Sequence, residues 1–119
     1  MSIPRRQRQW DIYRANLGEG PDVMVLVVSS DETNDILESQ VVSCELVSEG
    51  TARLPATPVT IRAAEGDSGL PEPVFVTVAT LASLPRNCLV SLEGRLESAP
   101  LRLAVLRAID VLVGAVPWP

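Results

Sequence analysis

The amino-acid sequence predicts a mainly β fold that ends in one C-terminal helix. Short apolar or alternating segments are separated by glycine- and proline-rich loops, which is typical of strands. One longer apolar stretch near the C-terminus has the start and stop signals of a helix. The 119 residues correspond to the usual size of one domain. We therefore expect a single domain over 1–119, with an arginine-rich flexible arm at 1–8, a helix at 98–114 and a tail at 115–119.

The first half of the chain predicts three strands. Residues 11–17 indicate a first strand, and a loop with glycine and proline separates it from a second. Residues 23–29 are apolar without alternation, which is typical of a strand buried on both faces. Ser30 or Asp31 is then expected to cap a single helical turn. Residues 40–47 alternate as a half-buried strand does. Its inward side chains are expected to be Val42, Cys44 and Leu46.

The second half predicts three further strands before the helix. Prolines flank the segments around 58–62 and 74–79, where they suit the starts or edges of strands. After a turn, residues 89–96 alternate again and indicate a half-buried strand. We expect Val90, Leu92 and Leu96 to face inward, and Ser91, Glu93 and Arg95 to face outward.

The C-terminal helix has clear boundary signals. Ser98 is a suitable N-cap, and Pro100 lies in the first turn, where its missing N–H costs nothing. Gly114 supplies a stop. The only polar positions, Arg102, Arg107 and Asp110, occupy an arc of roughly 140°. Most of the helix must therefore be covered, most simply by a second copy in a two-fold homodimer. The alternative is that the tail folds back over it.

Composition excludes several classes of enzyme. The chain has no histidine and two cysteines, so it lacks the ligands of a zinc site and the base of a Ser-His-Asp triad. We expect no metal and no cofactor. Cys44 and Cys88 lie far apart in strand-like segments, and free thiols are favoured over a disulfide. The segment Gly66–Gly69, which has the sequence GDSG of trypsin-like nucleophile segments, is interpreted as a loop.

Charge limits the nucleic-acid surface that the chain can offer. The net charge of −5 argues against a broad phosphate-binding footprint. All ten cations are arginine, which suits bidentate phosphate recognition but also fits a compositional bias of the genome. No run is long enough to span a membrane, and no secretory signal is evident. We expect a cytoplasmic protein that has no membrane partner.

Four short pieces of sequence, taken in order, resemble the MazF/PemK toxins of type II toxin-antitoxin systems. They are Asp11-Ile12-Tyr13, the segment from Val25 to Asp31, Leu84-Pro85-Arg86 and Gly94-Arg95-Leu96. The resemblance covers nearly the whole chain and depends on order and spacing. It implies a small SH3-like β-barrel of the MazF/CcdB type. It also implies a homodimer that cuts single-stranded mRNA without metal, leaves a cyclic phosphate, and binds an antitoxin protein.

The same resemblance locates the expected chemistry. The family uses an arginine at the start of its second strand and a threonine at the end of its third. In this chain Val23 and Val47 fall at those positions. The hypothesis is therefore an endoribonuclease with relocated residues. Its candidate catalytic residues are Ser48, Thr51 and Arg53, and its candidate RNA-binding residues are Arg53 and Arg86.

Two alternatives remain open. The first is a non-nuclease toxin of the CcdB kind, which binds DNA gyrase. Trp118, just beyond the terminal helix, would then contact the partner, although it could equally pack on its own helix. The second alternative is a catalytically inert relative that binds only a regulator.

Overall fold

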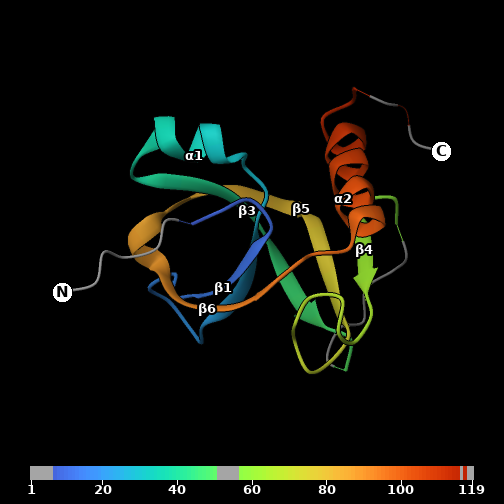
Figure 1. The fold of residues 1–119 in the computed structure, drawn as a ribbon, viewed down its shortest axis with the longest axis horizontal. Coiled ribbons are helices and arrows are strands. Elements are labelled where there is room, and N and C mark those ends of the chain that lie inside the picture. Colours follow the sequence, from blue (N-terminus) through green and yellow to red (C-terminus); the bar gives the residue numbers. More distant parts are fainter. Residues whose placement is uncertain (1–6, 51–56, 116, 118–119) are drawn as a thin grey trace.

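The computed structural model describes residues 7–50, 57–115 and 117, and shows one curved antiparallel sheet with a helix against it (Figure 1). The six strands are β1 (Asp11–Ala15), β2 (Val23–Val27), β3 (Gln40–Ser48), β4 (Thr60–Ala63), β5 (Val74–Pro85) and β6 (Leu89–Arg95). The helices are α1 (Asp31–Leu37), the 3-10 helix η1 (Arg86–Cys88) and α2 (Ala99–Leu112). The predicted mainly β fold with a C-terminal helix is confirmed.

The strand order is β4-β5-β3-β2-β1-β6. Within the described residues β4 and β6 are the two edges and do not pair with each other. The predicted barrel is therefore approximate, because the sheet curves without closing. β5 extends beyond the predicted 74–79, since its second half pairs with the first half of β3.

The two faces of the sheet carry separate apolar clusters. The larger cluster packs beneath α2 and includes Ile12, Leu26 and Cys44. The smaller cluster lies on the other face of β1, β2 and β3, around Tyr13 and Val25. β2 therefore has buried side chains on both faces, as its unbroken apolar run predicts. The side chains expected inside β3 face the larger cluster, with Cys44 and Leu46 buried and Val42 partly so.

α1 begins where the sequence predicts, but it is longer than a single turn. The Ser30 hydroxyl accepts a hydrogen bond from the backbone N–H of Thr33 at 3.2 Å and so caps the helix. The buried Asn34 ties α1 to the sheet, because its amide donates to the carbonyl of Ser29 at 3.2 Å. The Ser29 hydroxyl in turn contacts Asn34 and accepts from the N–H of Val42 at 3.0 Å.

β6 departs from its predicted pattern. Val90 and Leu92 were expected to face inward, yet they are 52% and 47% exposed, and only Leu96 is buried. The cause is the irregular pairing of β6 with β1, whose register shifts twice and skips Val90. A bulge interrupts the two-residue alternation on which the prediction relied, and an edge strand has no second neighbour to restore it.

α2 confirms the predicted cap and leaves apolar surface uncovered. The Ser98 hydroxyl accepts from the N–H of Leu101 at 3.4 Å, and the helix ends at Leu112, before Gly114 at φ +80°. Its buried side chains are Val105, Ala108 and Val111, whereas Leu103, Leu106, Leu112 and Val113 are exposed. None of the described helices is long and apolar enough to cross a membrane.

Candidate functional site

Ser48, the first predicted catalytic residue, lies at the end of β3 on the face that carries α2. Its hydroxyl donates to Glu72 Oε2 at 2.9 Å. With Met24 and Leu46 it lines an open, mostly apolar pocket of about 190 Å³. No register shift separates Val47 from Ser48, so no bulge turns the hydroxyl to the side of Val47.

Arg86, the predicted RNA-binding arginine, lies near the opposite end of β3. Its backbone N–H donates to the carbonyl of Ser39 at 2.9 Å, and its guanidinium donates to the carbonyl of Asn34. Arg86 thereby joins η1 to α1. Because Gln40 pairs with Pro85, Ser48 lies roughly 25 Å along the strand from Arg86. Within one copy these two residues cannot contact the same phosphate.

Three other predicted site residues lie outside the described residues: Thr51, Arg53 and Trp118. The same holds for 1–6 of the N-terminal arm. Arg8 of the arm is described, and its guanidinium lies 3.8 Å from Asp31.

The structure brings the two valines of the expected active site together. Val25 pairs with Glu45, and the same register places Val23 across from Val47. Side chains directly opposite each other share a face, so both valines are on the side of Glu45. Both are half-buried. The two positions are therefore adjacent, as a joint active site requires, but neither side chain can move a proton or hold an anion.

Polar groups lie beside these valines on the same face of the sheet. Glu45 pairs with Thr77, which pairs with Thr60, while Val47 pairs with Phe75, which pairs with Arg62. We define the open face by these six side chains: Glu45, Val47, Thr60, Arg62, Phe75 and Thr77. All except Thr77 are exposed or half-buried, and they lie opposite the larger apolar cluster and α2.

Arg62 presents a bidentate guanidinium on the open face. Its Nε and Nη2 donate to the two carboxylate oxygens of Glu49 at 2.8 and 3.1 Å. The hydrogen bond from Arg62 lowers the pKa of Glu49, and the same bond raises the pKa of Arg62. Because the pair is exposed, an anion from solution can reach the guanidinium. A planar guanidinium that binds one carboxylate in two places can bind a phosphate in the same way.

β5 bulges away from β3 beside Glu45. Ser43 pairs with Ala82 and Glu45 pairs with Thr77. Between these two pairs, β5 has the four residues Val78–Leu81, whereas β3 has only Cys44. The Thr80 hydroxyl bridges the gap: it accepts from the N–H of Glu45 at 2.7 Å and donates to the carbonyl of Thr77 at 2.7 Å.

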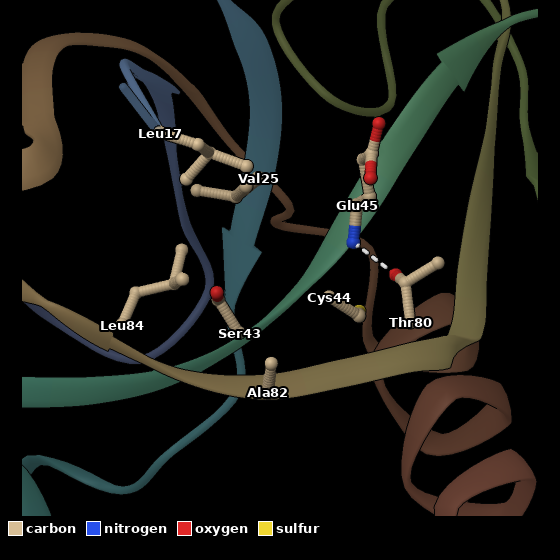
Figure 2. A pocket seen from close by; sticks show the side chains of 8 residues that line it. All are labelled: Leu17, Val25, Ser43, Cys44, Glu45, Thr80, Ala82 and Leu84. Carbon is tan, nitrogen blue, oxygen red and sulfur yellow. Dashed lines mark hydrogen bonds between the residues drawn. The ribbon is translucent and has the colours of Figure 1, made fainter. Parts of the chain in front are cut away.

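An open pocket of about 80 Å³ lies at this bulge (Figure 2). Its lining includes Leu17, Val25, Ser43, Cys44, Glu45, Thr80, Ala82 and Leu84. Burial raises the pKa of the Cys44 thiol to about 12, so this group stays protonated and is no nucleophile. Both cysteines are free, as expected. Bulges are common next to active sites, where they redirect side chains.

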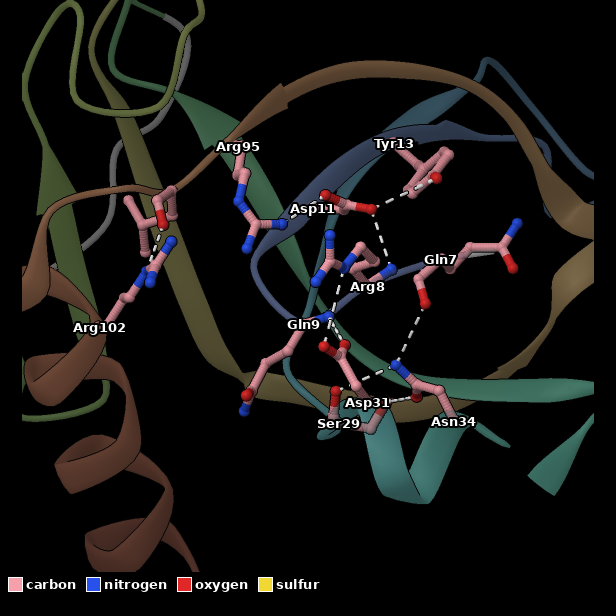
Figure 3. A network of polar contacts seen from close by, with 11 residues as sticks. Gln7, Arg8, Gln9, Asp11, Tyr13, Ser29, Asp31, Asn34, Arg95 and Arg102 are labelled. Carbon is pink, nitrogen blue, oxygen red and sulfur yellow. Dashed lines mark hydrogen bonds and ion pairs between the residues drawn. The ribbon is translucent and has the colours of Figure 1, made fainter. Parts of the chain in front are cut away.

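A second polar cluster joins the start of β1 to the end of β6 (Figure 3). Asp11 is fully buried, and its carboxylate pairs with the guanidinium of Arg95 at 2.8 Å. The same carboxylate accepts from the backbone N–H of Arg8 at 2.9 Å and from the Tyr13 hydroxyl at 3.5 Å. Because these groups satisfy one another, we assign the cluster to holding the fold.

Sequence reasoning did not select Glu45, Arg62 or Thr80. The alternation of residues 40–47 marked Glu45 as an outward polar residue, and the strand predicted around 58–62 ended at Arg62. Nothing in the sequence showed that these two segments become near neighbours. The pairing of β5 with both β3 and β4 brings Glu45 and Arg62 near each other, and the bulge of β5 places Thr80 beside Glu45.

No family model and no curated protein matches the chain. Among solved structures, the chain is similar to an endoribonuclease in complex with its cognate antitoxin from a mycobacterial species. The two chains are 21% identical with a TM-score of 0.75, and the match covers 95% of this chain and 99% of the other. A MazF toxin from Mycobacterium tuberculosis is 18% identical with a TM-score of 0.71, covering 91% and 99%. A MazE-MazF structure from Deinococcus radiodurans is 17% identical with a TM-score of 0.71, and the match covers 93% of this chain and 98% of the other.

These similarities extend over almost the full length of each protein. The chain therefore has the fold of MazF endoribonuclease toxins.

Proposed function

We propose that this chain is the toxin of a toxin-antitoxin system and cuts single-stranded mRNA in the cytoplasm without a metal ion. The observation that carries the proposal is the full-length match in fold to endoribonuclease toxins, one of them bound to its antitoxin. The open face adds a carboxylate, an exposed guanidinium and an aromatic ring on one surface. Fold alone does not determine activity, so the assignment needs a chemical test.

The test is cleavage of a long RNA by the purified protein in excess EDTA, followed by sequencing of the new ends. We expect breaks at a short recurring sequence, because toxins that read a few bases cut at defined sites. Intact RNA after prolonged incubation at high protein concentration would contradict the proposal. A preparation of Asp11→Ala, which we expect to unfold readily, controls for a contaminating nuclease.

A second copy of the chain is the partner that the exposed apolar surface of α2 suits best. Leu103 is 67% exposed, and Leu106 lies nearly one turn further along the same helix at 40%. Contiguous apolar surface of this kind marks an interface. We also propose that an antitoxin binds the folded toxin, as in the neighbouring structures.

Changing Leu103→Asp and Leu106→Asp together is expected to convert the dimer into a monomer, because two carboxylates would be desolvated in the contact. Light scattering after size-exclusion chromatography measures the mass. Ile36→Asp, at an even more exposed apolar position on α1 (80%), is the control and should leave the dimer intact. A wild-type chain that elutes as a monomer at all concentrations would rule this interface out.

One observation favours a second candidate function. Val23 and Val47 remove the expected arginine and threonine without disturbing the fold, which suits an inert relative that still binds an antitoxin. Such a protein would bind its partner and leave both RNA and growth unaffected. The cleavage test and a growth test with induced protein separate the two candidates.

A further inference from the structure

We propose that the reaction centre of this chain lies on the open face, with Glu45 as the general base and Arg62 as the cation that holds the scissile phosphate. This inference rests on the proposed function and names the residues that perform it. It follows from the register of β3, β5 and β4, from the bulge in β5, and from the exposure of the two groups.

Glu45 has the surroundings of a reactive carboxylate. Its backbone is fixed by two hydrogen bonds at the bulge, since its N–H donates to Thr80 and its carbonyl accepts from the Thr77 hydroxyl at 2.7 Å. Its side chain is half-buried at the rim of the pocket. In Figure 2 the backbone nitrogen of Glu45 points toward Thr80, and its carboxylate points away from Thr80. Among the described residues no hydrogen bond or ion pair engages this carboxylate, so it is free to accept a proton.

Arg62 lies on β4, two strands from Glu45 and on the same face. Arg62 is two strand spacings (roughly 10 Å) across the sheet from Glu45 and two residues (roughly 7 Å) along it, a separation of roughly 12 Å. The two long side chains and one phosphodiester between them can bridge this gap. Only the exposed Glu49 engages the guanidinium among the described residues. An RNA phosphate can replace that carboxylate with the same bidentate geometry.

The surface between these two charged groups suits a nucleotide. Phe75 on β5 lies between the strands that carry Glu45 and Arg62, and Val47 is the next residue along β3 on the face of Glu45; both are half-buried. An aromatic ring offers a stacking surface to a base. The hydroxyl of Thr80 lies at the rim of the pocket beside Glu45. The charged groups are therefore separated by an apolar platform that accepts a base or ribose.

The proposed step conserves atoms and charge. Glu45 takes the proton of the ribose 2′-hydroxyl, and the 2′ oxygen forms a bond to phosphorus. The bond from phosphorus to the 5′ oxygen breaks, and that oxygen leaves with the electron pair and takes a proton from water. The resulting hydroxide removes the proton from Glu45. Arg62 offsets the negative charge that builds on the non-bridging oxygens. The products are a 2′,3′-cyclic phosphate and a 5′-hydroxyl.

The first test is Glu45→Gln, which keeps the shape of the side chain but cannot accept the proton. We expect cleavage to fall about 100- to 10,000-fold, as is usual when a general base is removed. Glu32→Gln, at an exposed carboxylate on α1, is the matched control and should retain full activity.

The second test is Arg62→Gln, which we expect to lower cleavage about 100- to 1,000-fold because charge on the phosphate is no longer offset. Arg62→Lys should recover part of the loss. Arg14→Gln is the matched control, since Arg14 is as exposed as Arg62 (48% against 50%), also pairs with a carboxylate, and faces the other side of the sheet. Unchanged circular dichroism and melting temperature show that each variant is folded.

The outcomes separate this inference from the proposed function. If the wild type leaves RNA intact, the proposed function fails, and the assignment of Glu45 and Arg62 fails with it. If the wild type cuts RNA and folded Glu45→Gln and Arg62→Gln cut equally well, the proposed function stands and the inference is overturned. Loss in both variants with full activity in Glu32→Gln and Arg14→Gln supports it.

Discussion

Asp11→Ala is expected to lower the free energy of unfolding by about 3–5 kcal/mol, the usual cost of removing one partner from a buried ion pair. The Asp11 carboxylate is fully buried and binds Arg95 at 2.8 Å. It also accepts the backbone N–H of Arg8 at 2.9 Å. Alanine would leave a cation and a backbone donor without this carboxylate, where burial limits replacement by water.

Urea denaturation of the wild type and the variant measures this loss. Asp22→Ala is the matched control, because Asp22 also pairs with an arginine, at 3.4 Å from Arg14, but on the surface. Removal of an exposed pair should change stability by no more than about 1 kcal/mol. Equal midpoints for the two variants would show that burial of Asp11 contributes nothing beyond a surface pair.

Gly94→Ala is expected to destabilise the fold by about 2–3 kcal/mol through overpacking. A Cβ atom at this position would lie 2.3 Å from the carbonyl oxygen of Ser68, which belongs to the backbone and cannot rotate away. The same oxygen accepts the N–H of Arg95 at 3.1 Å, so any shift of the loop also weakens the contact that holds β6. This close approach explains a glycine inside β6, one residue before the strand ends.

Thermal unfolding of Gly94→Ala, compared with Gly50→Ala, isolates this contact. Among the described residues, an added Cβ at Gly50 would meet only the Ser48 hydroxyl oxygen, at an ordinary 3.7 Å. We expect the melting temperature of Gly50→Ala to stay close to that of the wild type, while Gly94→Ala melts several degrees lower. A Gly94→Ala protein as stable as the wild type would mean that the loop around Ser68 is free to move.

The order of elements could be predicted because local signals decide it. Alternation in 40–47, the apolar run of 23–29 and the caps at Ser30 and Ser98 depend on neighbouring residues alone, and the structure confirms each of them. The orientation of Val90 and Leu92 could not be predicted, because the bulges of β6 arise from its pairing with a strand far away in sequence.

The candidate site shows the same division. Val23 and Val47 could be located from the resemblance to the MazF/PemK toxins, and their missing chemistry was evident from residue type. Glu45 and Arg62 were not selected, because only the pairing of β5 with both β3 and β4 brings them to one accessible surface. Ser48 and Arg86 were predicted to serve one RNA-cleaving site, but they lie near opposite ends of β3.

The most direct test of a metal-independent transesterification on the open face is the mass of the products from a short RNA oligonucleotide cut in excess EDTA. The account predicts a 2′,3′-cyclic phosphate on one fragment and a 5′-hydroxyl on the other. It also predicts no cleavage when the ribose at the scissile position is replaced by 2′-deoxyribose, because Glu45 then has no hydroxyl to deprotonate. Fragments with 5′-phosphate ends, or cleavage of the deoxy substrate, would contradict it.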